Sequence, residues 1–445
     1  MYPAPGRGRG PVGVVRPGTS IALLDDEPRP GKGCRGGWLA AAPAGFLCNG
    51  ENLSADPGHP MAAAAIAELV RPSGEGVLPY RYAFSRGAPM YGRLPTEAEQ
   101  ERVEGPPERR ARARKPKGGF GGHDELTVED PIEAEGELPA ALAEGRALPS
   151  PRGETPLVRK WLPEGSTVAF ARAFRAEGRT WLVSTDLSLV PADRVLAYRV
   201  SSFQGVRLGG GARLPIAWAR RAPRPFYRRE AGGRFVPTGE SLGARERVAL
   251  SAERATGARG AYLRVEGEGE RYLAEADVAV ARERPPPPGV GAGEKWVDIR
   301  LREGTLVAYE GARPVFATLV AGGAGGPGAP GDTDRELVDK SATPVGTYRV
   351  SWKVSASRMT PEKGEPERFW LAEVPHTLYF RAPFAIHTAY WHEDFGVPKS
   401  AGCVNVSPAD GKFLFEWADP PLPPGWQGVG PGRETGLGTR VVLAP

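Results

Sequence analysis

One pattern of short strands occurs twice in the chain, and this repeat constrains the fold more than any other feature. Leu78 to Thr96 resembles Leu214 to Thr238, since each has a short apolar strand, then Arg, an Ala-Pro pair and a Tyr. The stretches 165–195 and 245–278 then share a strand, a turn and a second strand that begins beside an aromatic residue. Apolar residues alternate, Gly and Asp stand at the turns, and no helical period is sustained. The sequence therefore predicts a mostly β protein built from small repeated modules.

These modules resemble bacterial SH3-like domains, which often accompany enzymes of the cell wall. The pattern places the first, shorter module at residues 1–56, the second at 78–200 and the third at 201–283. Between the strands of the second module, at about 97–158, charged residues are dense and β-branched or aromatic residues are few. Such a segment cannot bury enough apolar surface to offset its ordering entropy, so we expect a mostly disordered insertion there.

A run of four prolines in "RERPPPPGVGAGEK" predicts a stiff spacer at 284–295. The pattern changes after it, and we expect a separate, mostly β domain at 296–445. Within that domain "SPADGKFLFEWA" predicts one short helix, with Ser407 as its N-cap and Pro408 at its first position.

Length and composition limit the kind of protein without identifying it. The 445 residues suffice for about three domains. A net charge of +5 is mild for this length, so we expect no nucleic-acid partner, although a basic surface suits an anionic polymer such as a bacterial wall. No run of about 18 apolar residues occurs, so no membrane span is expected. The oligomeric state stays open.

Two of the three cysteines, Cys34 and Cys48, lie 14 residues apart, a spacing that suits neighbouring strands. A disulfide there would add roughly 3 kcal/mol by loop closure and would imply an oxidising compartment. The alternative is a pair of buried thiols. The sequence begins without the pattern of a signal peptide, so we expect either a cytosolic protein or one whose export signal has been removed or is unrecognised. Cys403 is left over as a candidate reactive thiol.

The scarce reactive side chains gather near the C-terminal end. His387 follows the short strand "FAI" and lies 16 residues before Cys403, so two adjacent strands can bring them together. A neighbouring base activates a thiol, which otherwise is only a few per cent thiolate near pH 7. Gly402 lets the backbone approach a substrate carbonyl, and the N–H groups of Gly402 and Cys403 are candidates for an oxyanion hole.

The motifs "TPVGTY", "IHT" and "SAGCVNVSP" together resemble the L,D-transpeptidase catalytic domain of the YkuD type. The resemblance covers Trp296 to Ala444, about a third of the chain. It implies that Cys403 is the acyl-accepting nucleophile, that His387 is the base and that the carbonyl of Thr388 holds the imidazole. The chain departs from the family pattern at Ala401, where many members carry His, and this departure puts the rate in question.

Other side chains have roles implied by the same resemblance. Ser400 and Asn405 would shape the cysteine loop. Tyr390, Trp391 and His392 would line the groove for the donor peptide. For His392 and for His376 the ordinary alternative is a packing or surface histidine, which we favour.

The resemblance implies an enzyme of the cell envelope or periplasm that acts on peptidoglycan stem peptides without a metal or other cofactor. It would release D-Ala from a stem tetrapeptide through a cysteine thioester, and then pass the acyl group to an amine or to water. One alternative is a non-catalytic wall-binding protein with a degenerate domain, which only Ala401 supports. A metal site built from His387, His392 and Cys403 is disfavoured, because no fourth ligand is evident. A cytosolic cysteine hydrolase is disfavoured by the expected disulfide.

Overall fold

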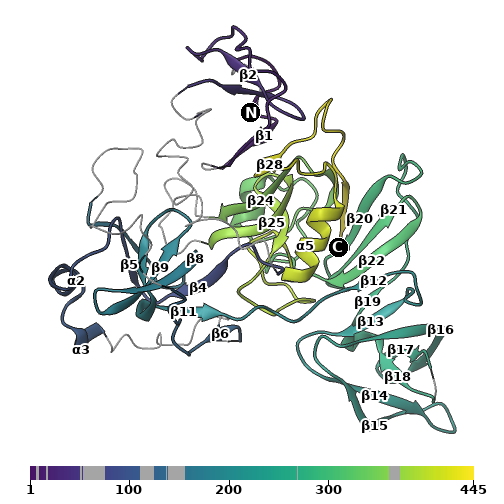
Figure 1. Ribbon diagram of the computed structural model, residues 1–445. Coiled ribbons are helices and arrows are strands. Elements are labelled where there is room, and N and C mark those ends of the chain that lie inside the picture. Colours follow the sequence, from purple (N-terminus) through teal and green to yellow (C-terminus); the bar gives the residue numbers. More distant parts are fainter. Residues whose placement is uncertain are drawn as a thin grey trace.

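The computed structural model describes residues 1–6, 10–16, 19–50, 53, 76–110, 125–136, 138, 156–267, 269–359 and 371–445. In this part of the chain strands dominate and helices are few and short, which confirms the predicted mostly β class (Figure 1). Among these residues no helix has both the length and the apolar character needed to cross a membrane.

Two six-stranded sheets form most of the C-terminal region. The first has the order β1 (Gly13–Val14), β28 (Gly428–Val429), β24 (Trp352–Met359), β25 (Leu371–Arg381), β26 (Phe384–Thr388) and β27 (Val404–Val406). The second has the order β12 (Val206–Arg207), β22 (Arg313–Leu319), β21 (Thr305–Glu310), β20 (Lys295–Arg300), β29 (Arg440–Ala444) and β23 (Gly346–Arg349). Apolar side chains of both sheets meet in one core, including Ile299, Leu306, Leu378 and Ile386.

Helix α5 (Pro408–Trp417) packs against β25 and β26 and covers part of this core (Figure 1). It begins as predicted, because Ser407 Oγ accepts the N–H of Asp410 at 3.2 Å and Pro408 needs no donor at the first position. A second helix, α4 (Asp334–Asp339), has a capping box made by Thr333 and Glu336.

The two repeated stretches fold with the same topology. Without the short β6 (Thr127–Val128), the first repeat has the order β11 (Val195–Tyr198), β4 (Arg81–Ser85), β8 (Thr167–Ala176), β9 (Arg179–Ser184), β10 (Leu189–Pro191), β5 (Ala88–Tyr91) and β7 (Val158–Leu162). The second repeat has β19 (Val278–Ala281), β13 (Ile216–Ala219), β16 (Arg247–Gly257), β17 (Gly260–Val265), β18 (Tyr272–Ala274), β14 (Arg224–Arg229) and β15 (Phe235–Leu242). Each repeat also has one 3₁₀ turn before its last strand, at Ala192–Arg194 and Glu275–Asp277. The internal repeat is thus confirmed, while the SH3-like class of its copies stays a prediction.

The insertion in the first repeat is partly ordered, contrary to the expectation for 97–158. Its start forms α2 (Glu97–Glu104), with a capping box made by Thr96 and Glu99, followed by α3 (Pro107–Arg110). The side chain of Glu104 is buried and pairs with Arg179 of the sheet at 2.7 Å. Local capping and this ion pair order a segment whose composition alone indicates disorder. Residues 111–124, 137 and 139–155 lie outside the described residues.

The N-terminal part does not form a β module of its own within its described residues. Strand β1 adds to the C-terminal sheet, with Gly13 opposite Val429. Strands β2 (Trp38–Ala40) and β3 (Phe46–Cys48) form a two-stranded sheet. The expectation of an SH3-like module at 1–56 is therefore corrected here, because the segment is too short to bury two sheet faces and uses a neighbouring sheet instead.

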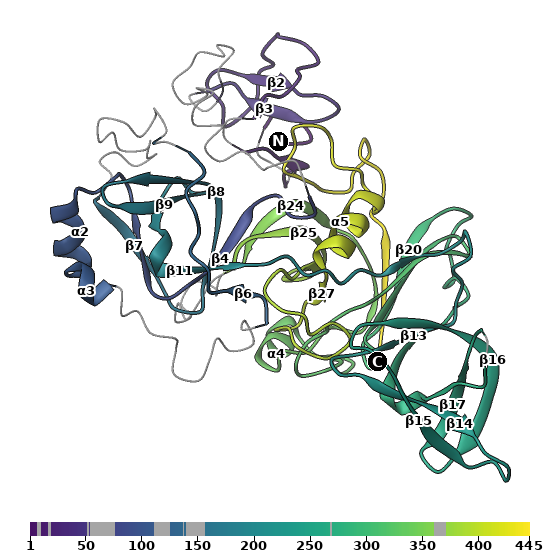
Figure 2. The same ribbon diagram turned by 60° about the horizontal axis from the view of Figure 1, so that its bottom comes forward.

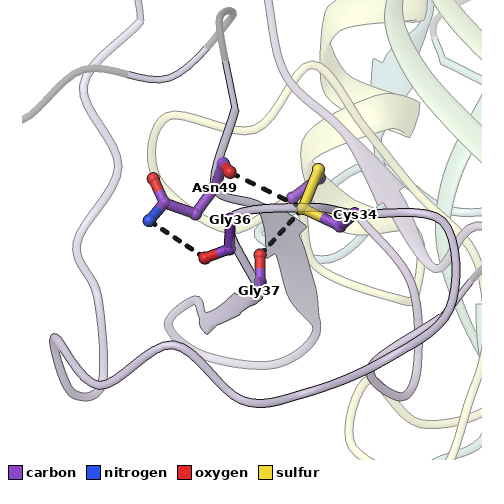
Figure 3. Close-up of a disulfide and its surroundings, with 5 residues drawn as sticks. Cys34, Gly36, Gly37 and Asn49 are labelled. Carbon is purple, nitrogen blue, oxygen red and sulfur yellow. Dashed lines mark hydrogen bonds between the residues drawn. A yellow bond between two sulfur atoms is a disulfide. The ribbon is translucent and has the colours of Figure 1, made fainter.

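A disulfide joins Cys34 to Cys48 beside this small sheet (Figure 3). The Cys34 sulfur lies 2.8 Å from the carbonyl oxygen of Gly37, a close contact in which the bonded sulfur has no proton to donate. Asn49 donates from its side chain to the carbonyl of Gly36 at 3.3 Å. These contacts hold the loop of Cys34 against the end of β3.

The proline-rich segment does not separate the second repeat from the C-terminal region. Trp218 of the second repeat shares a buried cluster with Trp296, Tyr309 and Leu319 of the C-terminal sheet. Strand β12, just before the second repeat, pairs with β22. Residues 284–295 therefore connect two parts that pack against each other. The apolar faces of the second repeat and of the C-terminal sheet bury each other and so leave water.

Candidate active site

Parallel pairing of β26 and β27 brings His387 and Cys403 to neighbouring strands. His387 lies opposite Asn405, so Cys403 stands two residues before that position, directly before β27 begins at Val404. Ile386 and Val404 face the core, and successive strand residues point to opposite faces. His387 therefore points away from the core. The sulfur of Cys403 lies 4.0 Å from the carbonyl oxygen of Pro383, just before β26, and the main-chain N–H of Ala385 favours its thiolate form.

The imidazole of His387 is held in one tautomer. Its Nδ1 lies 3.1 Å from the carbonyl oxygen of Thr388. A carbonyl can only accept, so Nδ1 carries the proton and Nε2 keeps a free lone pair. Burial lowers the pKa of His387 to about 4, although the carbonyl of Thr388 opposes this shift. The ring is thus neutral near pH 7 and can accept a proton at Nε2.

Cys403 is in its thiol form in this arrangement. Burial raises the pKa of the Cys403 thiol to about 11, and the N–H of Ala385 only partly offsets that rise. The side chain is nevertheless partly exposed. A thiol beside a neutral imidazole must lose its proton during the reaction, so this pair suits general-base activation rather than a preformed ion pair.

The cysteine loop is braced by Ser400. Its Oγ accepts the N–H of Gly402 at 3.0 Å and donates to the carbonyl of Cys403 at 2.5 Å. Gly402 has a φ of 123°, and a Cβ there would lie 2.9 Å from the carbonyl oxygen of Ala342. The expectation that the Gly402 N–H serves an oxyanion hole is corrected in this structure, because that N–H already has an acceptor. The N–H of Cys403 is left as the main-chain candidate.

Asn405 and Ala401 differ in their surroundings. Asn405 is buried, and its main-chain N–H donates to the carbonyl of Ala321 at 2.8 Å. Its side-chain Oδ1 has no hydrogen-bond partner among the described residues. Ala401 is exposed. Asn405 therefore joins the two sheets, while position 401 adds nothing to the packing around the thiol.

Two of the three expected groove residues are buried in packing. The hydroxyl of Tyr390 donates to the carbonyl of Ala372 at 2.9 Å and lies 2.5 Å from Thr167 Oγ1 of the first repeat. The ring of His392 is buried, and its Nδ1 accepts the N–H of Asp394 at 3.0 Å. Only Trp391 is partly exposed, and its ring lies beside that of His387. The groove assignment of Tyr390 is corrected, because the first repeat covers its side chain. His392 is the packing histidine that we favour from the sequence, so its groove role is corrected as well.

The sequence patterns assigned no role in the site to two residues near it, His376 and Tyr379. His376 Nδ1 lies 3.0 Å from Thr388 Oγ1, and burial lowers the pKa of His376 to about 3. Tyr379 lies opposite Ala385 on β25, and its hydroxyl is 2.9 Å from Ser357 Oγ. Only the pairing register identifies them, because neither belongs to a motif. No group of acidic, His and Cys side chains suited to a metal ion occurs in the part of the chain that the structure describes.

Comparison with known proteins assigns the C-terminal third. Residues 294–443 match the family model of the L,D-transpeptidase catalytic domain. The comparison with curated proteins gives no match.

Among solved structures, an L,D-transpeptidase from Xylanimonas cellulosilytica is 28% identical, with a TM-score of 0.24, over 36% of this chain and 64% of that one. One from Stackebrandtia nassauensis is 23% identical, with a TM-score of 0.20, over 35% and 57%. One from Mycobacterium smegmatis is 14% identical, with a TM-score of 0.25, over 42% and 90%. The chain thus spans less than two thirds of the first two. On the match of the family model, the protein carries an L,D-transpeptidase catalytic domain at residues 294–443.

Proposed function

We propose that the protein is a peptidoglycan L,D-transpeptidase with Cys403 as nucleophile and His387 as base. One observation carries the proposal: His387 donates a hydrogen bond from Nδ1 to the carbonyl of Thr388, and it lies on the strand beside the one that Cys403 precedes. The free Nε2 is the atom that a general base needs. Both residues lie within the matched catalytic domain.

The chemistry follows from this pair. Nε2 of His387 takes the thiol proton while the Cys403 sulfur attacks the carbonyl carbon between diaminopimelate and the terminal D-Ala. The tetrahedral intermediate collapses to a thioester as the imidazolium gives its proton to the leaving nitrogen. D-Ala therefore leaves with a neutral amino group. An amine of a second stem peptide, or water, then attacks the thioester and restores the thiol. The N–H of Cys403 faces the negative charge that develops on the carbonyl oxygen.

The location and the other modules belong to the same proposal. A wall substrate places the enzyme in the cell envelope, and the Cys34–Cys48 disulfide fits an oxidising compartment. The two repeats would act as SH3-like modules beside the polymer. No cofactor is needed for the steps above.

The second candidate is a wall-binding protein with a degenerate catalytic domain, and Ala401 is the observation that favours it. Its exposed position argues against it, since a side chain there takes no part in holding His387 or Cys403. The two candidates differ in one measurable property, the turnover of a stem tetrapeptide.

Mass spectrometry of purified stem tetrapeptide incubated with the full chain tests the proposal. We expect release of D-Ala together with a cross-linked dimer or a tripeptide. Cys403→Ala is the matched control and should yield neither product. An unchanged tetrapeptide with the native chain would refute the catalytic proposal and favour the wall-binding candidate.

A further inference from the structure

A row of neighbouring aromatic rings runs from the first repeat to His387. Tyr82 of β4 stacks on Tyr390, with ring centroids 3.8 Å apart and planes at 24°. Tyr390 meets the ring of Trp391 edge-on at 4.9 Å. The ring of Trp391 then lies 5.9 Å from that of His387, with planes at 29°. These four side chains are called the aromatic row below.

Hydrogen bonds fix the end of the row that belongs to the first repeat. The hydroxyl of Tyr82 donates to the carbonyl of Glu373 on β25 at 2.7 Å. Thr167 of β8 accepts the N–H of Ala372 at 2.9 Å, and its Oγ1 also lies 2.5 Å from the hydroxyl of Tyr390. Tyr82 and Tyr390 are 2% and 1% exposed, so neither ring has room to turn. The first repeat thereby holds both strand β25 and the loop after β26.

His387 is itself buried, with 3% of its surface exposed, so the side chains packed around it set the tilt of its ring. Its hydrogen bond from Nδ1 to the carbonyl of Thr388 fixes one ring nitrogen but does not by itself set that tilt. The direction of Nε2 depends on this tilt, and Trp391 is the ring that lies against the imidazole. A displacement of about 1 Å in a reacting group can cost about a hundredfold in rate.

We propose that the first repeat is a working part of the catalytic unit, in which Tyr82 and Tyr390 are positioning residues that orient the base His387 through Trp391. The expected effect on turnover rests on the proposed function. The expected effect on the orientation of His387 toward Cys403 rests only on the contacts within the aromatic row. It assigns to a repeat outside the matched domain a role in the reaction rather than in attachment to the wall.

Tyr82→Leu in the full chain tests the proposal with two readouts. The first is kcat and KM for D-Ala release, and the second is the rate at which iodoacetamide alkylates Cys403 at pH 7. We expect kcat to fall by about tenfold to a hundredfold with KM within about twofold, and alkylation to slow by a similar factor. Tyr82→Phe keeps the stacked ring and should restore both to within about twofold of the native values.

Tyr91→Leu is the matched control, because Tyr91 is a fully buried ring of the same repeat outside the row. It should lower the unfolding temperature as Tyr82→Leu does, while leaving both rates close to native. If Tyr82→Leu does not fold, Thr167→Val removes the hydroxyl beside Tyr390 and should still lower kcat severalfold.

Equal losses in Tyr82→Leu and Tyr91→Leu would overturn the proposal, because the repeat would then act through stability alone. If the proposed function itself is wrong, the native chain releases no D-Ala. The alkylation rates of the native chain and the variants then decide the role of the aromatic row without any turnover data. A native alkylation rate in folded Tyr82→Leu would overturn it in that case too.

Discussion

Removal of everything before Trp296 should leave a fragment that does not fold as a stable monomer. The fragment loses β1 and β12, which pair with β28 and β22, and the second repeat that shares a core with its sheet. Five large side chains of that shared core would gain solvent: Trp296, Val307, Tyr309, Leu319 and Phe395. Burial of each is worth about 1.5–3 kcal/mol. If the second repeat supplies half of their cover, the loss is about 4–8 kcal/mol, similar to the whole stability of a domain.

The assay compares the fragment 296–445 with the fragment 201–445, which keeps the second repeat and β12. Thermal unfolding followed by circular dichroism and size-exclusion chromatography report folding and association. We expect a cooperative transition only for 201–445, and aggregation of 296–445. A monomeric 296–445 that unfolds within a few degrees of the longer fragment would refute the reasoning and restore the proline-rich segment as an autonomous boundary.

Four further predictions concern the site. Cys403→Ser and His387→Ala should each lower D-Ala release by several orders of magnitude, since nucleophile and base act as one unit; retained turnover in either would contradict the assignment. Ala401→His should change the rate modestly and leave the products the same, whereas revival of an inactive native chain would favour the degenerate domain. Gly402→Ala should cost about 1–3 kcal/mol in unfolding free energy and most of the activity, because φ at Gly402 is positive and the added Cβ would meet a main-chain oxygen; native stability in urea titrations would exclude that strain. The acid limb of the kcat profile should lie near pH 4, because burial holds the pKa of His387 there and only the neutral ring acts as base; a limb near 6.5 would show that the ring is solvated.

Local patterns predicted what depends on local structure. The alternation of strand residues gave the β class, the spacing of similar stretches gave the two repeats, and Ser407 with Pro408 gave the start of α5. The distance along the chain from His387 to Cys403 suited adjacent strands, and the structure pairs them in parallel.

Contacts between distant segments could not be predicted in the same way. The sequence predicts that Tyr390 lines a groove, but Thr167 and Tyr82, more than 200 residues earlier, contact its side chain and cover it. The occupied N–H of Gly402 depends on the rotamer of Ser400, which no motif specifies. The proline run indicates a stiff connection, but stiffness does not tell whether the parts on either side touch.

The shared topology of the two repeats has a mechanical consequence. Their strand pairings align Tyr82 of β4 with Ile216 of β13, and each of these residues packs in a cluster with residues of the catalytic domain. The two repeats lie on different flanks of that domain (Figure 2). The first repeat holds the hairpin of β24 and β25, and the second holds the sheet of β21 and β22. A shift of one sheet of the domain against the other would therefore also move the two repeats relative to each other. The displacement would be larger at the far ends of the repeats than at the sheets. A pair of fluorophores, one on each repeat, would test whether a substrate changes the distance between the repeats, without a label near the thiol.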